Sequence, residues 1–260
     1  MDDPVRQIMW ASQLTGEWVT AHLVSDFPNI KQAQLFNSLT SEFVDQLLLT
    51  GKNVYLPTGA FLFHQQDPAS HCYLLLDGQI KLESTNRGGD QVSVQQVAPG
   101  GMIALLGVFQ KTKYPVSALA ILDCVVLSWT VDDFQNFCVE VPQLHINSTQ
   151  ILTMRSQEFQ SRILELSTEK VERRVAHALL RLAQHLGKRI QSGVLIDLRL
   201  TRQDIAELSG TTQFTASRTL SRLQNAGIIA GTKHQIIIQD IHQLVDLAED
   251  FPNKYRSLLD

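Results

Sequence analysis

The sequence is poor in cysteine, and its cysteines lie far apart. Cys72, Cys124 and Cys138 are the only three among 260 residues, an odd number at wide spacing. This pattern does not build the disulfide framework of a small secreted protein. We expect the three thiols to be buried as small apolar side chains in a reducing compartment.

Long apolar runs are also missing. No stretch reaches the roughly 18 consecutive apolar residues that are needed to cross a bilayer. The first ten residues, MDDPVRQIMW, begin acidic and lack the basic segment followed by an apolar one that marks a secretory signal. With 44% hydrophobic and 18% charged residues, the composition is that of a folded globular protein. The expectation is a cytoplasmic protein that does not enter membranes.

Signatures of catalysis are absent as well. The chain has no phosphate-binding glycine loop, no HExxH and no GxSxG sequence. His71 beside Cys72, and Asp123 beside Cys124, are the only arrangements that hint at a nucleophile. Because adjacent residues on a strand point to opposite faces, His71 is poorly placed to activate Cys72. We therefore do not expect an enzyme.

Positive charge is scarce overall but concentrated in one segment. The net charge of the chain is −4 at pH 7. Residues 168–235 hold eleven Lys and Arg against five Asp and Glu, so this segment carries +6 and the remainder carries −10. Such a division is expected when one domain meets a polyanion and the other does not.

The first half of the chain is rich in short β-type runs. They follow one another from about Leu35, separated by turn signals such as PTG at 57–59 and DG at 77–78. Several short strands at regular spacing predict a sandwich, a barrel or a double-sheet roll. The runs are FLF at 61–63, CYLLL at 72–76, QIKLES at 79–84, QVSVQQV at 91–97 and ALAILDCVVLSW at 118–129.

Three helices are predicted after the strands. Asp132 and Asp133 can cap a short first helix that ends near Val141. A long helix can begin at Pro142, where a first-turn proline is tolerated, and a third runs from Thr168 to Leu186. The long helix carries an apolar stripe that repeats every seven residues, and the stripe predicts a dimerisation helix. Packing of the stripe on the chain's own β-roll is the alternative. The stripe consists of Leu152, Phe159, Ile163 and Leu166.

Residues 200–229 carry the strongest functional signal. Thr201 can cap a helix, with Asp204 at the capping-box position, and Gly210 can end that helix. Thr211 or Thr212 can cap a second helix, whose outer face is polar. A short helix, a glycine turn and such a second helix predict a helix-turn-helix that reads the major groove of DNA. The following IIAGTKHQIIIQ predicts a hairpin wing, and the inward residues of the second helix are Ala216, Leu220 and Leu223.

The outward residues of the second helix are assigned to DNA. Arg218 can donate two hydrogen bonds to guanine, Gln213 can bond adenine in the same way, and the Phe214 ring can pack on a thymine methyl group. Ser217 can reach a base or a phosphate. Phosphate contacts fix the register without reading sequence. They are assigned to Thr201, Arg202, Thr212, Arg222 and Lys233, and Thr211 completes the set of DNA-binding candidates.

The order of β-roll, long helix and winged helix resembles the superfamily of the cyclic-AMP receptor protein and the fumarate–nitrate reduction regulator. The resemblance covers residues 35–240 and is most specific in LTRQDIAELSG at 200–210 and in the Ser217-Arg218 pair. It implies an α+β fold with an N-terminal double-stranded β-helix (jelly roll), a homodimer, a palindromic double-stranded DNA site and RNA polymerase as a partner. It also implies an effector between the roll and the long helix. Residues at the family's β-roll turns are Gly59, Asp67, Tyr73, Gly78 and Gly100.

These observations divide the chain into five segments. They are an N-terminal helical extension at 1–34, a β-roll sensor domain at 35–141, a dimerisation helix at 142–167, a winged helix-turn-helix domain at 168–247 and a C-terminal tail at 248–260.

The sequence departs from the family in its ligand-binding stretch. The family's cyclic-nucleotide binders carry a glutamate for the ribose and an Arg-Ser or Arg-Thr pair for the phosphate. The matching residues 100–120 contain no acid, and Tyr114 and Pro115 fall near the places of the arginine and its hydroxyl partner. We expect weak or no cyclic-nucleotide binding. No cysteine precedes Cys72, so an iron–sulfur cluster is not expected, and Phe214 replaces the family's recognition-helix glutamate, which leaves the half-site open.

The effector stays open at this level. The candidate pocket is more apolar than a nucleotide site, and some family members hold haem there. Haem, a small organic ligand and no effector are the three alternatives. The alternative function is a ligand-binding module whose helical domain contacts protein rather than DNA. The pocket residues are Ile103, Leu105, Leu106, Tyr114, Ser117 and Met154, and the candidate haem ligands are His64, His71 and His145.

Overall fold

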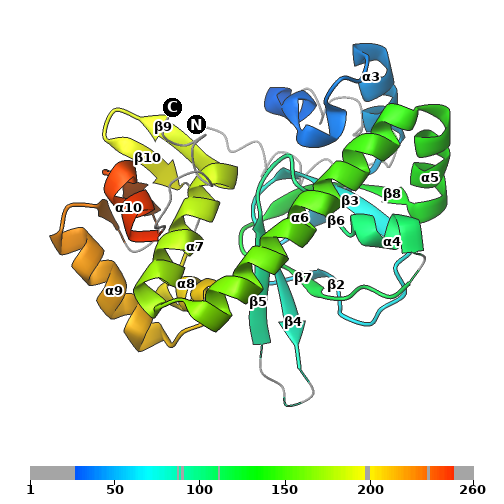
Figure 1. Cartoon of the computed structure of the whole chain (residues 1–260). Helices are drawn as coiled ribbons and strands as arrows, with labels where there is room; N and C mark the ends of the chain where they lie inside the picture. Colours follow the sequence, from blue (N-terminus) through cyan, green and yellow to red (C-terminus); the bar gives the residue numbers. More distant parts are fainter. Residues whose placement is uncertain are drawn as a thin grey trace. The chain divides into compact units, whose positions relative to one another are not determined.

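The structure describes residues 27–86, 88, 91–110, 112–196, 200–232 and 235–248 (Figure 1). This computed structural model divides the chain into two compact units, residues 1–157 and 158–260. The boundary lies inside helix α6 (Pro142–Thr168), which contributes its first half to one unit and its last turns to the other. Each unit has its own fold.

In the described part of the first unit, two antiparallel four-stranded sheets form a β-roll. Their strand orders are β1-β8-β3-β6 and β2-β7-β4-β5. The roll predicted from the short strands is therefore confirmed. The strands are β1 (Lys52–Leu56), β2 (Phe61–Phe63), β3 (His71–Asp77), β4 (Ile80–Thr85), β5 (Gln91–Val97), β6 (Met102–Ile103), β7 (Ser117–Ala120) and β8 (Cys124–Thr130).

The central strands β3 and β8 separate two apolar cores. In β8, Val125, Leu127 and Trp129 belong to a core that includes the helices, whereas Cys124 and Val126 belong to the core of the second sheet. Strand β3 alternates in the same way between residues 72 and 76. Because side chains of a strand point to opposite faces in turn, one continuous apolar run can supply both cores.

The run at 118–129, which the sequence presents as one β-type segment, is two strands in different sheets. Strand β7 pairs with β2 and β4, whereas β8 pairs with β1 and β3. Asp123 holds the connection, because its Oδ1 accepts hydrogen bonds from the amide and the hydroxyl of Thr58, both at 2.8 Å. These two bonds lower the pKa of Asp123. The residues between the strands include neither Gly nor Pro, so the usual turn signal was absent.

Helices also occupy places where the sequence predicted only the roll. The longest of them follows Thr40, whose hydroxyl accepts from the amide of Phe43 at 3.3 Å and so caps the helix. It packs on the roll, since Trp129 Nε1 donates to the Leu47 carbonyl at 3.0 Å. These unpredicted helices are the 3-10 helix η2 (Gln34–Phe36) and the α-helices α3 (Ser41–Thr50) and α4 (Leu105–Gln110). The 3-10 helix η1 (Pro28–Gln32) falls within the extension that was predicted to be helical. Of the extension predicted at 1–34, residues 1–26 lie outside the described residues.

Helix α6 starts at Pro142, as the sequence predicts, directly after helix α5 (Val131–Glu140). Its first half buries Leu144 and Ile151 in the helical core of the first unit. Asn147 anchors this half, because its Nδ2 donates to the carbonyls of Leu35 and Asn37, both at 2.8 Å. The chain before the roll is therefore fixed to the start of the long helix.

The second unit is a winged helix-turn-helix. Helix α7 begins three residues after the predicted Thr168, because Lys170 takes an extended conformation with φ −68° and ψ 151°. A four-stranded sheet of order β11-β12-β10-β9 accompanies the helices in the described residues. Helix α10, which the sequence did not predict, buries Leu244, Val245 and Ala248. The elements are α7 (Val171–Leu186), β9 (Gly187–Ile190), β10 (Gly193–Ile196), α8 (Arg202–Ser209), α9 (Gln213–Asn225), β11 (Ile229–Thr232), β12 (Gln235–Ile238) and α10 (Ile241–Ala248).

Helix lengths and polarity also bear on membranes. Within the described ranges, every helix is too short or too polar to cross a bilayer.

Candidate nucleic-acid interface

Helix α8 begins with a complete capping box. The Thr201 hydroxyl accepts from the amide of Asp204 at 3.1 Å, and Asp204 Oδ2 accepts from the amide of Thr201 at 2.8 Å. Ile205 and Ala206 turn into the unit and are fully buried. The two caps satisfy amides that would otherwise lack partners at the start of the helix. Helix α8 is thereby fixed at the end that leads in from the sheet.

A left-handed glycine joins α8 to α9. Gly210 has φ +60° and ψ +47°, and its amide donates back to the carbonyls of Ala206 and Glu207. A Cβ atom at this position would lie 2.2 Å from Cδ2 of Leu166 on α6. Only glycine meets both the backbone conformation and the close approach without strain.

Helix α9 presents one buried face and one exposed face. Thr212 caps it, because its hydroxyl accepts from the amide of Thr215 at 3.3 Å. The buried face holds the predicted Ala216, Leu220 and Leu223, together with Thr219. The opposite face is exposed and polar apart from one phenylalanine, as the face that meets DNA must be. Its members are Gln213, Phe214, Arg218, Ser221 and Arg222.

Two of these outward side chains, Phe214 and Arg218, lie in the first half of the helix. Phe214 is 77% exposed, which is an unusual state for a phenylalanine in a folded monomer. Arg218 is exposed and has no hydrogen-bond or ion-pair partner among the described residues. A charged group and an apolar ring left unpaired on one helix face are typical of a surface that awaits a partner.

The side chains that are predicted to contact phosphates differ in their exposure and in the bonds they already make within the protein. Arg202 Nη1 donates to the carbonyl of half-buried Ser217 at 3.2 Å, and Arg222 forms an ion pair with Glu172 of α7. Arg222 must therefore leave Glu172 before it can bind a phosphate. Thr211 is half-buried beside the exposed Thr212. Lys233, which the sequence predicts at the tip of the wing, lies outside the described residues.

Sequence reasoning missed two arginines behind the helix-turn-helix. Arg162 Nη2 donates to the Glu207 carbonyl at 2.7 Å, and Arg174 Nη2 donates to the Gly210 carbonyl at 3.1 Å. Both arginines are more than 30 residues away from their acceptors along the chain. No local pattern signals such a contact, so only the fold could reveal it.

The six predicted effector residues lie in different surroundings, and their role in binding an effector stays a prediction. Ile103 and Leu105 are fully buried in two different cores, because the chain turns from β6 into α4 between them. Leu106 and Met154 are exposed at 36% and 42%. Ser117 is engaged by the roll itself, since its hydroxyl accepts from the amide of Gln65 at 2.9 Å. Within this stretch, Ile103 and Leu105 therefore contribute to the cores, whereas Leu106 is exposed.

Tyr114 fills space inside the roll. Its ring stacks on Phe63 with a centroid distance of 3.8 Å, and Phe63 stacks on Tyr73 at 5.9 Å. The Tyr114 hydroxyl donates to the His71 carbonyl at 3.0 Å and accepts from the His71 amide at 3.1 Å. Burial and the neighbouring Tyr114 raise the pKa of Tyr73 well above its ordinary value. Where a phosphate clamp would need a cation, the roll thus holds a neutral and satisfied aromatic cluster.

The three candidate haem ligands stand on separate elements. His64 is exposed after β2 with its ring against Phe61, and His71 bonds the Ser70 hydroxyl through Nδ1 at 2.9 Å. His145 is exposed on α6 with its ring edge-on to Phe109. Across the residues with described positions, no group of three or more His, Cys, Asp or Glu side chains could hold a metal ion. The cysteines are buried as predicted, and burial raises the pKa of Cys124 and Cys138 to about 11.

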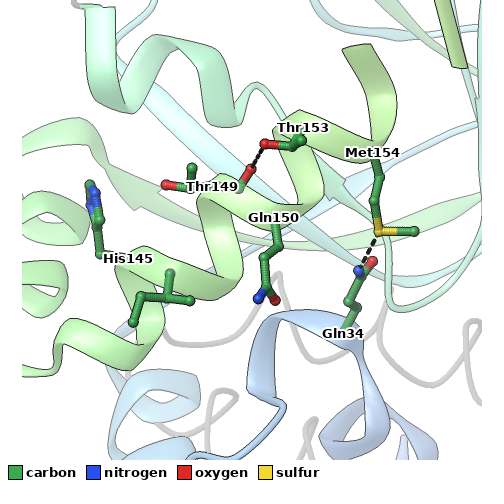
Figure 2. A pocket seen from close by; sticks show the side chains of 7 residues that line it. Gln34, His145, Thr149, Gln150, Thr153 and Met154 are labelled. Carbon is green, nitrogen blue, oxygen red and sulfur yellow. Dashed lines mark hydrogen bonds between the residues drawn. The ribbon is translucent and has the colours of Figure 1, made fainter. Parts of the chain in front are cut away.

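A shallow hollow of about 430 Å³ follows the outer side of α6 within the first unit (Figure 2). Gln34 reaches across it from η2, and its Nε2 lies 2.9 Å from Sδ of Met154. Of the predicted effector residues and haem ligands, only Met154 and His145 line this hollow. The remaining lining residues are Ile146, Thr149, Gln150 and Thr153.

Comparison with known proteins gives consistent matches to both units. Residues 53–140 match the family profile of the cyclic nucleotide-binding domain, and residues 173–247 match that of the Crp-like helix-turn-helix domain. Together the two segments make up more than half of the chain.

Similar proteins span nearly the same length. The chain is 28% identical to the cyclic AMP receptor protein of Thermus thermophilus over 201 residues, which are 77% of this chain and 89% of that protein. It is 27% identical to the global nitrogen regulator of Synechocystis sp. over 224 residues, which are 84% of this chain and 95% of that protein. The structure of FixK2 from Bradyrhizobium japonicum shares the fold with a TM-score of 0.70 at 20% identity, covering 78% of this chain and all of that one.

Proposed function

The chain belongs to the superfamily of the cyclic-AMP receptor protein and the fumarate–nitrate reduction regulator, and we propose that it binds a palindromic DNA site as a homodimer through α9. Members of this superfamily are DNA-binding transcription regulators, so the alternative of a purely protein-binding helical domain is not favoured. One observation carries the proposal. Helix α9 turns Ala216 and Leu220 into the protein and leaves Arg218 exposed, with no hydrogen-bond or ion-pair partner in the part of the chain that the structure describes.

Within the site, each side chain has a proposed role. Arg218 donates two hydrogen bonds to a guanine, Gln213 bonds an adenine, and Phe214 covers a thymine methyl group. Ser217, close to the same groove, contacts a base or a phosphate. The remaining candidates hold the phosphate backbone and set the register. They are Thr201, Arg202, Thr211, Thr212, Arg222 and Lys233.

The proposed dimer forms along α6. Phe159 and Ile163 are 43% and 65% exposed on the last turns of this helix, and a helix pair would cover them. Leu152 is already partly buried against the core of its own unit. Leu166, at 42% exposure, also fills the space beside Gly210, so the predicted stripe serves the helix-turn-helix as well as the proposed partner. In a two-fold dimer the two copies of α9 would read two inverted half-sites.

As a regulator of transcription, the protein is placed in the cytoplasm, with RNA polymerase as its partner on the promoter. No catalytic role is assigned. Cys72, the one cysteine beside a histidine, is fully buried, and that burial raises the pKa of its thiol. A buried neutral thiol is not a nucleophile.

Selection from randomised duplexes tests the proposed DNA binding. The full chain should enrich an inverted repeat, and its affinity for that duplex should fall linearly with salt on logarithmic axes as phosphates replace their counterions. Fluorescence anisotropy on the selected duplex and on a random duplex of equal length gives both affinities. Enrichment of no common sequence, together with equal affinity for the two duplexes, would contradict the proposal.

Cyclic nucleotides are not expected to bind in the roll. Tyr114 and Phe63 occupy the space, and the clamp residues of a phosphate are replaced by groups without positive charge. Calorimetric titration of the full chain with cyclic AMP or cyclic GMP should give no saturable heat up to about 1 mM, the concentration at which even weak binding registers. The Thermus thermophilus cyclic AMP receptor protein is the matched positive control. Saturable binding of either cyclic nucleotide at one site per chain would contradict this prediction.

A further inference from the structure

Helix α8 ends in carbonyl groups that need partners from outside the helix. The last four carbonyls of any α-helix have no amide to accept from within it, and together they form the negative end of the helix dipole. In α8 the Gly210 turn supplies only part of the need. The Gly210 amide reaches the Glu207 carbonyl at 3.3 Å, a long hydrogen bond, and the Gly210 carbonyl accepts from Arg174 of α7.

Two guanidinium groups complete this end of the helix. Arg162 of α6 donates to the Glu207 carbonyl at 2.7 Å, and Arg174 of α7 donates to the Gly210 carbonyl at 3.1 Å. Arg174 also donates to the Leu166 carbonyl at 3.4 Å, so one side chain joins the end of α6 to the turn. Positive groups at a helix C-terminus are stabilised by the dipole as well as by the hydrogen bonds.

Packing reinforces the same junction. The Leu166 side chain fills the space that a side chain at position 210 would occupy. Arg181 Nη1 lies 2.6 and 2.7 Å from the two carboxylate oxygens of Glu165, which is buried. Burial and the nearby Arg181 lower the pKa of Arg162, and Glu165 opposes this shift. Glu165 therefore balances two arginines at the place where α6, α7 and the turn meet within the second unit (Figure 1).

We infer that Arg162 and Arg174 are positioning residues for DNA recognition: they hold the α8–α9 turn against the end of α6 and thereby set the angle at which α9 enters the groove. The inference rests on the proposed function of α9. Gln213 follows Gly210 by three residues, so a small rotation of the turn displaces the first base-reading residue directly. Ile163, which is exposed on α6, directly follows Arg162. The same turn of α6 therefore contacts the helix-turn-helix and faces the second copy of the proposed dimer.

Arg162→Met tests the inference while keeping the apolar stem of the side chain. If α9 enters the groove at a different angle, it loses contacts with the bases but keeps its contacts with the DNA phosphates. Affinity for the selected palindrome should therefore fall about tenfold, and affinity for a random duplex should change little. The slope of log affinity against log salt on the random duplex should stay at the wild-type value. Arg162→Lys, which can still donate one hydrogen bond to the Glu207 carbonyl, should recover part of the loss.

Lys170→Met is the matched control. It removes one positive charge from the adjacent, exposed N-cap of α7, where the lysine side chain makes no capping hydrogen bond. The ratio of palindrome to random affinity should stay at the wild-type value. The hydrogen bonds of Arg174 are solvent-exposed. Arg174→Met should lower the ratio of palindrome to random affinity as Arg162→Met does, and it provides the test if Arg162→Met does not fold.

A wild-type ratio in Arg162→Met and Arg174→Met, or an equal loss on both duplexes, would overturn the inference. Failure of the proposed function looks different, because the wild-type chain would then prefer no duplex at all.

Discussion

Arg218→Ala is expected to abolish the preference for one base pair in each half-site. The guanidinium of Arg218 is exposed on α9 and has no partner within the described ranges, so binding a guanine breaks no existing contact. A bidentate arginine–guanine pair contributes about 1–3 kcal/mol of discrimination, which corresponds to roughly a fivefold to 150-fold loss of affinity per half-site. Affinity for a random duplex should show only the small decrease that follows from removing one positive charge.

Competition between the selected duplex and duplexes altered at one position measures the effect. Arg222→Ala is the control on the same face of α9, because a phosphate contact is lost equally on every sequence. The unfolding midpoint of Arg218→Ala should equal that of the wild type, since no described residue forms a hydrogen bond or an ion pair with this side chain. If the altered duplexes are still discriminated as before, Arg218 does not read a base.

Gly210→Ala is expected to lower the stability of the second unit. Its φ of +60° costs an alanine about 1–2 kcal/mol. The new Cβ would also lie 2.2 Å from Leu166, and forced overlap in a packed site costs about 1–3 kcal/mol. The free energy of opening α8 and α9 should therefore fall by about 2–5 kcal/mol, the sum of the two costs.

Gly227→Ala separates the two causes. Gly227 also has a positive φ, +72°, but a Cβ there meets no atom within 4 Å. It should show the backbone cost of about 1–2 kcal/mol alone. Tryptophan fluorescence cannot report the change, because Trp10, Trp18 and Trp129 all precede residue 158. Amide hydrogen exchange in α8 and α9 is the suitable measurement, and equal exchange in the two variants would show that Leu166 moves aside at no cost.

Local chemistry made the helix-turn-helix predictable. The capping box at Thr201, the glycine at 210 and the spacing of Ala216 and Leu220 each act within four residues of one another. The strands FLF and QVSVQQV were found with their observed ends, since turn residues bound them on both sides. Short-range rules sufficed wherever the structure itself is determined at short range.

Long-range packing limited the rest. The 118–129 run changes sheets at Asp123, whose partner Thr58 is 65 residues away. Leu105 looked like pocket lining but begins the short helix α4 and enters a core. The packing of Tyr114 inside the roll could not be predicted, because it depends on contacts with Phe63 and His71. The backing of the turn by Arg162 and Arg174 likewise depends on how three helices meet.

Replacing guanines of the selected palindrome by 7-deazaguanine, one at a time, tests most directly whether α9 lies in the major groove. This base lacks the N7 acceptor but pairs normally, so it removes one hydrogen bond at one known edge. One guanine per half-site should weaken wild-type binding, and the same substitution should have no further effect on Arg218→Ala. Uniform tolerance of 7-deazaguanine by the wild type, or an equal additional loss in Arg218→Ala, would contradict the placement of α9 against the bases.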